Sequence, residues 1–283
     1  MIYRWRELEL TFELQSDDAE AIRRGKELLS PGAVESDQDP DRRWTIGRGD
    51  TDESWRLTGT SEDRSLIPLV LADRELALLH VEHDAVDYLM HRTRLPAVHS
   101  ALLSREGRGV LIIGPSLAGK STLAAGLWRS GWTLMSDDVA FIDASRRVAS
   151  PAPRRVSLRF ASREIVGDNL WNEIANLPSC ARNSKGLFFH PHELCGSPRL
   201  RETRIAGVFF LARRGVGSVD HGIQRINPAA AAVALVPYVF RVRNLPFDRA
   251  VAAVAPLVAE VPAFDLGRND LATMVRSVEM QLA

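Results

Sequence analysis

The sequence predicts an α/β fold, with a small N-terminal α+β module over residues 1–95 and a larger α/β domain over residues 96–283. Three observations lead to this prediction. Residues 8–14 alternate apolar and polar side chains, as a half-buried strand does, and a helical pattern follows them. The run 110–113 is uniformly apolar, which is typical of a buried strand. It leads directly into a glycine-containing turn and a second helical pattern, the strand–loop–helix order of α/β domains.

The first part of the chain is expected to contain two helices and several short strands. In order, these are a strand at 8–14, a helix at 19–29, a loop over 33–54 around a short strand at 44–46, a strand at 66–71 and a helix at 75–94. Ser16-Asp17-Asp18 supplies cap residues for the first helix, and Pro31-Gly32 ends it. Pro68 lacks a backbone donor, so the strand around it is predicted to lie at a sheet edge.

The second part is expected to alternate strands and helices. Its elements are a strand at 97–103, a strand at 108–113, a helix at 119–130, strands at 132–135 and 139–142, a strand at 208–211 and a helix over the alanine run 229–232.

Composition excludes several classes of function. The chain has 283 residues, 45% of them hydrophobic and 25% charged, which is ordinary globular composition. Its 36 basic and 36 acidic residues give no net charge, so the positive field of a nucleic-acid-binding protein is missing. The two cysteines are too few for a disulfide framework, and the first residues lack the apolar core of a signal peptide. We expect a cytoplasmic protein with no nucleic-acid or membrane partner, and a homo-oligomer is compatible with these features.

Residues 114–122 read Gly-Pro-Ser-Leu-Ala-Gly-Lys-Ser-Thr and match the phosphate-binding pattern G-x-x-x-x-G-K-[ST]. The backbone N–H groups of such a loop form a concave nest, and the following helix adds the positive end of its dipole. Lys120 would reach the β- and γ-phosphates, and the Ser121 hydroxyl would ligate Mg²⁺. The motif therefore predicts a nucleoside triphosphate site formed by Gly114, Pro115, Ser116, Leu117, Ala118, Gly119, Lys120, Ser121 and Thr122.

Two consecutive acids follow the next predicted strand. Asp137 and Asp138 come after the strand at 132–135, so they are expected at the carboxyl end of a strand close to 110–113, where α/β sheets bind ligands. A carboxylate there can hold Mg²⁺ or accept the proton of an attacking hydroxyl. Alone, Ser-Asp-Asp at a strand end is more often a turn or a helix cap. With the phosphate-binding pattern nearby, we favour the functional interpretation.

Several segments together resemble one family. Gly109-Val110-Leu111-Ile112-Ile113-Gly114, the phosphate-binding motif, Leu123-Ala124-Ala125-Gly126-Leu127 and the stretch 131–139 (Gly-Trp-Thr-Leu-Met-Ser-Asp-Asp-Val) resemble, in order and spacing, the catalytic core of HPr serine kinase/phosphorylase and its relatives. His99 is similar to the histidine that these kinases carry ahead of their loop. Pro153-Arg154-Arg155-Val156-Ser157-Leu158-Arg159 resembles the Pro-Arg-Pro-Ile-x-Leu-Lys segment of the HPr-kinase-related subgroup.

This resemblance implies a phosphate-loop nucleotide-binding core of the HPr kinase and phosphoenolpyruvate carboxykinase type. It also implies ATP with Mg²⁺ as cofactors and transfer of the γ-phosphoryl group to a serine hydroxyl, on a peptide or small protein. On this chain, Lys120 and Ser121 would take the nucleotide and metal. Asp137 would be the base, Asp138 would assist it or bind the metal, and His99 would be a further catalytic candidate.

The chain also departs from the family pattern. Leu117 stands where the family usually has glycine, and the glycine-rich Glu-x-Arg-Gly-Leu-Gly segment linked to phosphorolysis is not recognisable after the aspartates. We therefore expect forward transfer without the reverse reaction. Two alternatives stay open, namely a nucleotide-binding sensor or scaffold without turnover and a regulatory HPr serine kinase.

Four further cations are candidates for contacting substrate or phosphate: Arg154, Arg159, Lys185 and Arg213. Arg213 follows a predicted buried strand and is either an electrostatic clamp or a solvated strand end. Lys185 begins a segment that either closes over the substrate or forms a plain apolar strand. The segment from His190 to Cys195 contains metal-capable side chains, but their spacing fits neither H-E-x-x-H nor C-x-x-C, so we favour a structural role.

Overall fold

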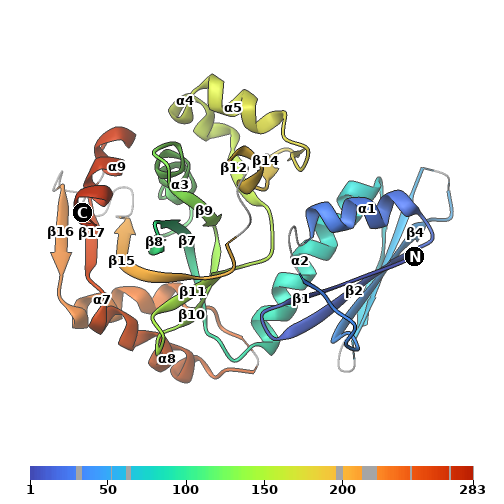
Figure 1. Ribbon diagram of the computed structural model, residues 1–283, viewed down its shortest axis with the longest axis horizontal. Coiled ribbons are helices and arrows are strands. Elements are labelled where there is room, and N and C mark those ends of the chain that lie inside the picture. The colour runs from blue at the N-terminus through green and yellow to red at the C-terminus, as the bar shows by residue number, and fades with distance from the viewer. Residues whose placement is uncertain are drawn as a thin grey trace. The chain divides into compact units, whose positions relative to one another are not determined.

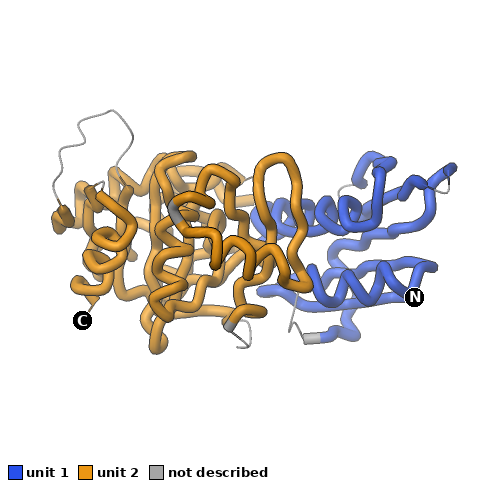
Figure 2. Tube along the Cα trace, turned by 90° about the horizontal axis from the view of Figure 1, so that it is seen from above, with its two compact units in different colours: residues 1–93 blue, residues 94–283 orange. Residues whose placement is uncertain are grey.

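The computed structural model describes residues 1–29, 34–51, 53–61, 65–195, 200–211, 222–242, 244–267 and 269–282. Its internal contacts divide the chain into two compact units, Met1–Thr93 and Arg94–Ala283 (Figure 2). The division falls just before the Leu95-Pro96 dipeptide. Within the described residues, the helices are too short or too polar to cross a membrane.

Unit 1 packs two helices against a sheet. Its elements are β1 (Ile2–Glu7), β2 (Leu10–Ser16), α1 (Ala19–Leu28), β3 (Val34–Glu35), β4 (Arg42–Arg48), β5 (Trp55–Thr60), β6 (Ser65–Leu71) and α2 (Arg74–Arg92). The strand order is β3-β1-β2-β4-β5-β6, antiparallel except between β2 and β4. Both helices cover the same face of this sheet (Figure 1). The aromatic rings of Trp5, Phe12 and Trp44 pack against one another in the core of unit 1, with centroids 5.5–6.0 Å apart.

Local signals predicted part of unit 1 correctly. Helix α1 starts after Asp18, whose carboxylate accepts a hydrogen bond from the Ala21 N–H at 3.0 Å. Strand β6, which contains Pro68, lies at the sheet edge as predicted. Strands β1 and β5 were missed, and the expected loop over 33–54 contains β3 and a longer β4. The charged residues of β4 favoured a loop in the prediction. In the structure Arg42 is nevertheless buried in the strand, because it forms an ion pair with Asp84.

Unit 2 is a mixed α/β domain. Its elements are β7 (Ala97–Arg105), β8 (Arg108–Ile113), α3 (Lys120–Arg129), β9 (Thr133–Ser136), β10 (Val139–Asp143), β11 (Val148–Pro151), β12 (Val156–Arg159), the 3-10 helix η1 (Phe160–Ser162), α4 (Arg163–Val166), α5 (Asp168–Ala175), β13 (Ala181–Arg182), β14 (Gly186–Phe189), α6 (His192–Cys195), β15 (Thr203–Leu211), β16 (Ile223–Ile226), α7 (Pro228–Leu235), the 3-10 helix η2 (Val236–Tyr238), α8 (Phe247–Glu260), β17 (Ala263–Leu266) and α9 (Leu271–Met280). The main sheet has the order β11-β10-β7-β8-β15-β17-β16, with β9 also pairing with β7, and β12-β14-β13 form a smaller sheet.

Both faces of the main sheet are covered, which explains the uniformly apolar strand β8. Val110 and Ile112 belong to the core that includes residues of α3 and α9, whereas Leu111 and Ile113 belong to the core that includes residues of α7 and α8. In Figure 1, α3 and α9 lie on one side of the sheet and α7 and α8 on the other. Residues 109–113 of β8 are therefore buried, and the segment that follows them starts from a well-packed position.

The direction of the strands brings distant segments to one edge. Strand β7 runs antiparallel to both β8 and β9, so β8 and β9 point the same way on either side of it. Strands β15 and β17 run parallel to β8. The carboxyl ends of β8, β9, β15 and β17 therefore lie at the same edge of the sheet. The sheet as a whole is mixed, because the hairpin from β7 to β8 reverses the chain at Glu106 and Gly107, which both have positive φ.

Candidate functional site

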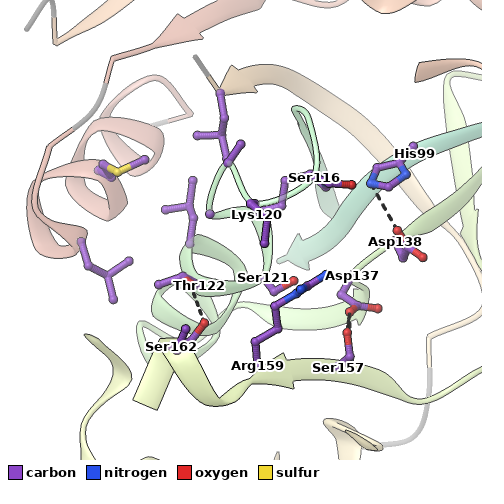
Figure 3. A pocket seen from close by; sticks show the side chains of 18 of the residues that line it. His99, Ser116, Lys120, Ser121, Thr122, Asp137, Asp138, Ser157, Arg159 and Ser162 are labelled. Carbon is purple, nitrogen blue, oxygen red and sulfur yellow. Dashed lines mark hydrogen bonds and ion pairs between the residues drawn. The ribbon is translucent and has the colours of Figure 1, made fainter. Parts of the chain in front are cut away.

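A cavity of about 510 Å³ opens at this edge of unit 2 (Figure 3). Its volume lies within the range of small-molecule sites. The lining comes from the segment after β8, from the ends of β9, β12 and β15, from β7 and from α9. The lining residues are His99, Ser116, Leu117, Ala118, Gly119, Lys120, Ser121, Thr122, Leu123, Asp137, Asp138, Ser157, Arg159, Ala161, Ser162, Leu211, Asn269, Leu271 and Met274.

Residues 114–122, hereafter the 114–122 loop, connect β8 to α3 and form the floor of the cavity. Gly119 is the N-cap of α3, with φ +102°, and makes no side-chain cap bond. The first N–H groups of a helix have no partner inside the helix, and the positive end of its dipole lies there. Gly114 is in close contact with the end of β15, because a Cβ atom on it would lie 3.0 Å from Leu211 Cβ. The loop therefore presents unpaired donors and partial positive charge to the cavity.

Leu117 also has a positive φ, +67°, although it carries a side chain. This region of backbone conformation favours glycine, so a residue with a side chain is strained here. The chain thus holds a leucine in a strained conformation, with 70% of its surface exposed at the cavity.

Lys120 lies at the centre of the cavity with only 6% of its surface exposed. Its ammonium donates hydrogen bonds to the Gly114 carbonyl at 2.8 Å and the Pro115 carbonyl at 3.3 Å. Burial lowers its pKa, although the charges of Asp138 and Asp137 act in the opposite direction. The ammonium is bound by neutral carbonyl groups of its own loop, which an anionic ligand could replace with stronger charge-assisted bonds.

Asp137 is a buried carboxylate with an incomplete set of partners. Only 4% of its surface is exposed. Its Oδ2 accepts hydrogen bonds from the N–H and the hydroxyl of Ser157, each at 2.8 Å (Figure 3). Its Oδ1 is buried and has no hydrogen-bond partner among the described residues. Burial raises the pKa of Asp137, and this effect outweighs the nearby charge of Arg154 and the Ser157 bonds. The side chain is therefore a stronger base than an ordinary aspartate.

Asp138 is bonded differently from its neighbour. Its Oδ1 lies 3.3 Å from His99 Nε2, and its Oδ2 accepts a hydrogen bond from Arg154. Burial lowers the pKa of His99, which Asp138 partly counteracts. The His99 ring also packs against Phe240, with centroids 6.0 Å apart. His99, Asp137 and Asp138 all lie on one side of Lys120 in Figure 3.

Arg159 and two hydroxyl groups complete the polar lining. The Arg159 side chain extends toward Ser121 and Asp137 (Figure 3), and its guanidinium forms no hydrogen bond or ion pair with the described residues. The Thr122 hydroxyl bonds to the Ser162 hydroxyl at 3.0 Å, whereas the Ser121 side chain faces the cavity. Arg159 is therefore a cation that remains available to a ligand.

The other predicted cations lie elsewhere or serve another purpose. Arg154 binds Asp138 and does not line the cavity. Lys185 is exposed just before β14, outside the lining, and its carbonyl accepts the Phe160 N–H at 3.2 Å. The segment after it is the plain apolar strand β14. Arg213 lies outside the described residues.

The His190–Cys195 segment carries structural contacts. The Glu193 carboxylate accepts hydrogen bonds from the Ser179 N–H and hydroxyl, at 3.1 and 2.9 Å, and the rings of His190 and His192 pack 5.4 Å apart. Across the residues that the structure describes, no group of three or more His, Cys, Asp or Glu side chains could hold a metal ion.

A divalent cation that binds partly through phosphate needs fewer protein ligands. Mg²⁺ typically takes one or two carboxylates together with substrate phosphates and water. Ser121 and Asp138 line the same cavity, so a hydroxyl oxygen and a carboxylate are available to such an ion. The residues present therefore fit Mg²⁺ bound together with a phosphate ligand.

Several lining residues carry no sequence signal. Ser157 occupies the variable position of the segment 153–159, and Leu211, Leu271 and Met274 come from elements far along the chain. Only the sheet topology brings them to the loop.

No protein-family model matches the chain, and no curated protein matches it. Among solved structures, the chain is similar to the HPr(Ser) kinase/phosphatase from Coxiella burnetii, with 15% sequence identity and a TM-score of 0.37. The match covers 65% of this chain and 97% of that one. This is a distant structural relationship, so function has to be inferred from the residues of the cavity.

Proposed function

We propose that the chain is an ATP- and Mg²⁺-dependent kinase that transfers the γ-phosphoryl group to a serine or similar hydroxyl of a peptide or small protein. The observation that carries the proposal is the juxtaposition in one cavity of a buried carboxylate with a free oxygen, Asp137, and a helix N-terminus with a buried lysine, Lys120. A buried carboxylate with a free oxygen suits proton abstraction. A helix N-terminus beside a buried lysine suits phosphate binding.

The triphosphate would lie over the 114–122 loop. The N–H groups at the start of α3 would donate to its oxygens, and Lys120 would exchange the carbonyls of Gly114 and Pro115 for phosphate. Arg159 would add a second positive charge from the opposite wall. These groups would hold the γ-phosphoryl in place and neutralise the charge that develops during transfer.

Ser121 and Asp138 would hold Mg²⁺ beside the phosphates. A carboxylate has about four lone-pair directions, so Asp138 can keep its contacts with His99 and Arg154 while it binds a cation. When bound, the ion supplies charge neutralisation at the phosphate oxygens. His99 and Arg154 would fix the orientation of Asp138.

Asp137 would act as the base. Its Oδ2 is held by Ser157, so Oδ1 is the atom free to accept the proton of the acceptor hydroxyl. The acceptor oxygen then forms a bond to the γ-phosphorus, the bond from that phosphorus to the β–γ bridging oxygen breaks, and ADP leaves. A base with a raised pKa holds this proton more firmly than an ordinary aspartate would.

Transfer of labelled phosphate from ATP to peptides and small proteins encoded beside the gene tests this proposal. The wild-type chain should label a hydroxyl residue, and Asp137→Asn should bind MgATP but fail to transfer. Asp265→Asn is the control for the same chemical change, because Asp265 lies on β17, is exposed and does not line the cavity.

Calorimetric titration with MgATP tests the nucleotide site separately. Lys120→Ala should lose most of the affinity, whereas Lys185→Ala should keep it, because Lys185 is exposed outside the cavity. If Lys120→Ala bound as tightly as the wild type, the phosphate site would lie elsewhere. Binding without transfer or slow hydrolysis would instead favour a nucleotide sensor.

A further inference from the structure

The two ends of the cavity differ in chemistry. Strands β7, β9 and β10 lie on one side of β8 in the sheet, and they position His99, Asp137 and Asp138. Strands β15 and β17 lie on the other side of β8, and the lining residues that follow or end them are Leu211, Asn269, Leu271 and Met274. The 114–122 loop therefore has a charged end on one side and an apolar end on the other.

The apolar end is a fixed surface. Asp270 caps α9 by accepting hydrogen bonds from the Thr273 N–H at 2.9 Å and its hydroxyl at 2.7 Å. Leu271 and Met274 are three residues apart and so lie on the same face of the helix. Helix α9 packs tightly on α3, because a Cβ atom on Gly126 would lie 2.7 Å from Leu271 Cδ1. Leu211 lies directly beside the start of the loop at Gly114.

Leu117 is another apolar lining residue of the cavity, and its conformation needs an explanation. It holds a positive φ of +67°, and 70% of its surface is exposed. Glycine would adopt this conformation without strain, and an exposed leucine contributes little to folding. A strained residue at a site suggests a role for its side chain in that site. A large apolar side chain at the mouth of a cavity is suited to cover an apolar, planar ligand group.

We infer that Leu117, Leu211, Leu271 and Met274 form the binding surface for the nucleobase of the nucleoside triphosphate, with Leu117 covering the base at the cavity mouth. This inference rests on the proposed function. The polarity of the cavity agrees with it, because a triphosphate lying over the loop with its γ-phosphate at the acidic end directs its nucleoside toward the apolar end.

Recognition at this end would depend on shape more than on hydrogen bonds. The four side chains have no strong donors or acceptors. The side-chain oxygen Oδ1 of the nearby Asn269 already accepts the Asp270 N–H at 2.9 Å. A surface of this kind binds the face of a base and discriminates weakly among bases of similar size.

Leu117→Gly tests the inference, with Mg²⁺-tripolyphosphate and MgATP as the two probes. Tripolyphosphate has no base, so it reports on the phosphate site alone. Glycine removes the apolar cover and also relieves the strained φ. We expect ATP affinity to fall about five- to tenfold, the effect of losing part of one leucine contact, while tripolyphosphate affinity stays unchanged or increases.

Two further variants complete the experiment. Met274→Ala should likewise weaken ATP and leave tripolyphosphate unchanged, with its thermal unfolding measured to show that α9 is intact. Val233→Ala is the matched control, since Val233 is an exposed apolar residue outside the cavity, and should change neither affinity. If Leu117→Gly changed ATP and tripolyphosphate affinity by the same factor, the base would not bind here although the phosphate site would stand. If neither probe bound the wild type, the proposed function would fail and this inference with it.

Discussion

Two buried carboxylates, Glu13 of unit 1 and Asp137 of unit 2, have opposite sets of bonding partners. Glu13 in unit 1 is 0% exposed and forms ion pairs with Arg4 and Arg43, which stand opposite it on the neighbouring strands β1 and β4. Burial alone would raise its pKa, but the two arginines together lower it. Asp137 in unit 2 is similarly buried, accepts no hydrogen bond from a cation among the residues that the structure describes, and has a raised pKa.

The difference separates a fully paired carboxylate from a partly paired one. Glu13 has enough partners to remain charged and to link three strands, so its ionised form stabilises unit 1. Asp137 is bonded on one oxygen and left unpaired on the other. An unpaired buried polar atom lowers the stability of the fold. Groups with such unfavourable surroundings are often found at functional sites. The incomplete bonding of Asp137 thus agrees with the role proposed for this carboxylate.

The largest expected effect is on phosphoryl transfer. Asp137→Asn should lower kcat by about 10³-fold or more, because an amide keeps the size of the side chain but cannot take a proton. Glu13→Gln should leave kcat unchanged. Single-turnover kinetics with the identified acceptor would measure both. Similar losses in the two variants would remove the functional distinction between the carboxylates.

The next effect is on the stability of unit 1. Glu13→Gln should lower the free energy of unfolding by about 2 kcal/mol, since hydrogen bonds to charged groups contribute about 1.5–3 kcal/mol each and Gln keeps part of them. The pKa of Glu13 is lowered by folding, so its contribution is present at neutral pH and is lost as pH falls through the folded-state pKa. Chemical denaturation at pH 7 and pH 3 should show the difference between variant and wild type shrinking at pH 3.

Ser157→Ala should change the pH dependence of transfer. The Ser157 hydroxyl donates to the ionised form of Asp137, so its loss should raise the pKa of Asp137 further and move the acidic limb of the kcat profile to higher pH. We expect kcat at neutral pH to fall by up to about tenfold, the cost of one hydrogen bond to a charged group. Ser157→Thr retains the hydroxyl and should restore the profile. A uniform loss of activity at every pH would indicate a purely structural role.

The smallest expected effect is on thermal stability: Asp137→Asn should raise it, whereas Glu13→Gln should lower it. Folding raises the pKa of Asp137, so the wild type loses stability as pH rises through the folded-state pKa. Asp137→Asn cannot ionise and should be more stable at pH 7.5, by about 2–4 °C in Tm for a gain of about 1 kcal/mol in a domain of this size. The gain should disappear below pH 4. Scanning calorimetry at the two pH values would detect it, and a lowered Tm at pH 7.5 would contradict the assigned pKa shift.

The sequence predicted the elements next to the 114–122 loop, from β7 to β10, but it did not predict β1 and β5 of unit 1 or most elements of unit 2 after β10, among them α8, β17 and α9. Strand β8 and helix α3 carry strong local signals, an apolar run and a motif with fixed spacing. In unit 1, β1 and β5 have charged residues among their apolar ones, and Arg42 in β4 is buried only because Asp84 pairs with it. Such pairing depends on residues far apart in the chain, which a local pattern does not contain.

In the candidate site, too, some features follow from local sequence and others depend on contacts between distant segments. The sequence by itself determined the 114–122 loop, the order of the elements around it and the candidate acids, because caps, turns and apolar periodicity depend on neighbouring residues. Only the tertiary structure decided that Ser157 bonds Asp137, that Arg154 binds Asp138 and that α9 provides an apolar wall. Burial and charge set the pKa of a group and the availability of its oxygens, and both arise from segments that the sheet brings together across long separations in sequence.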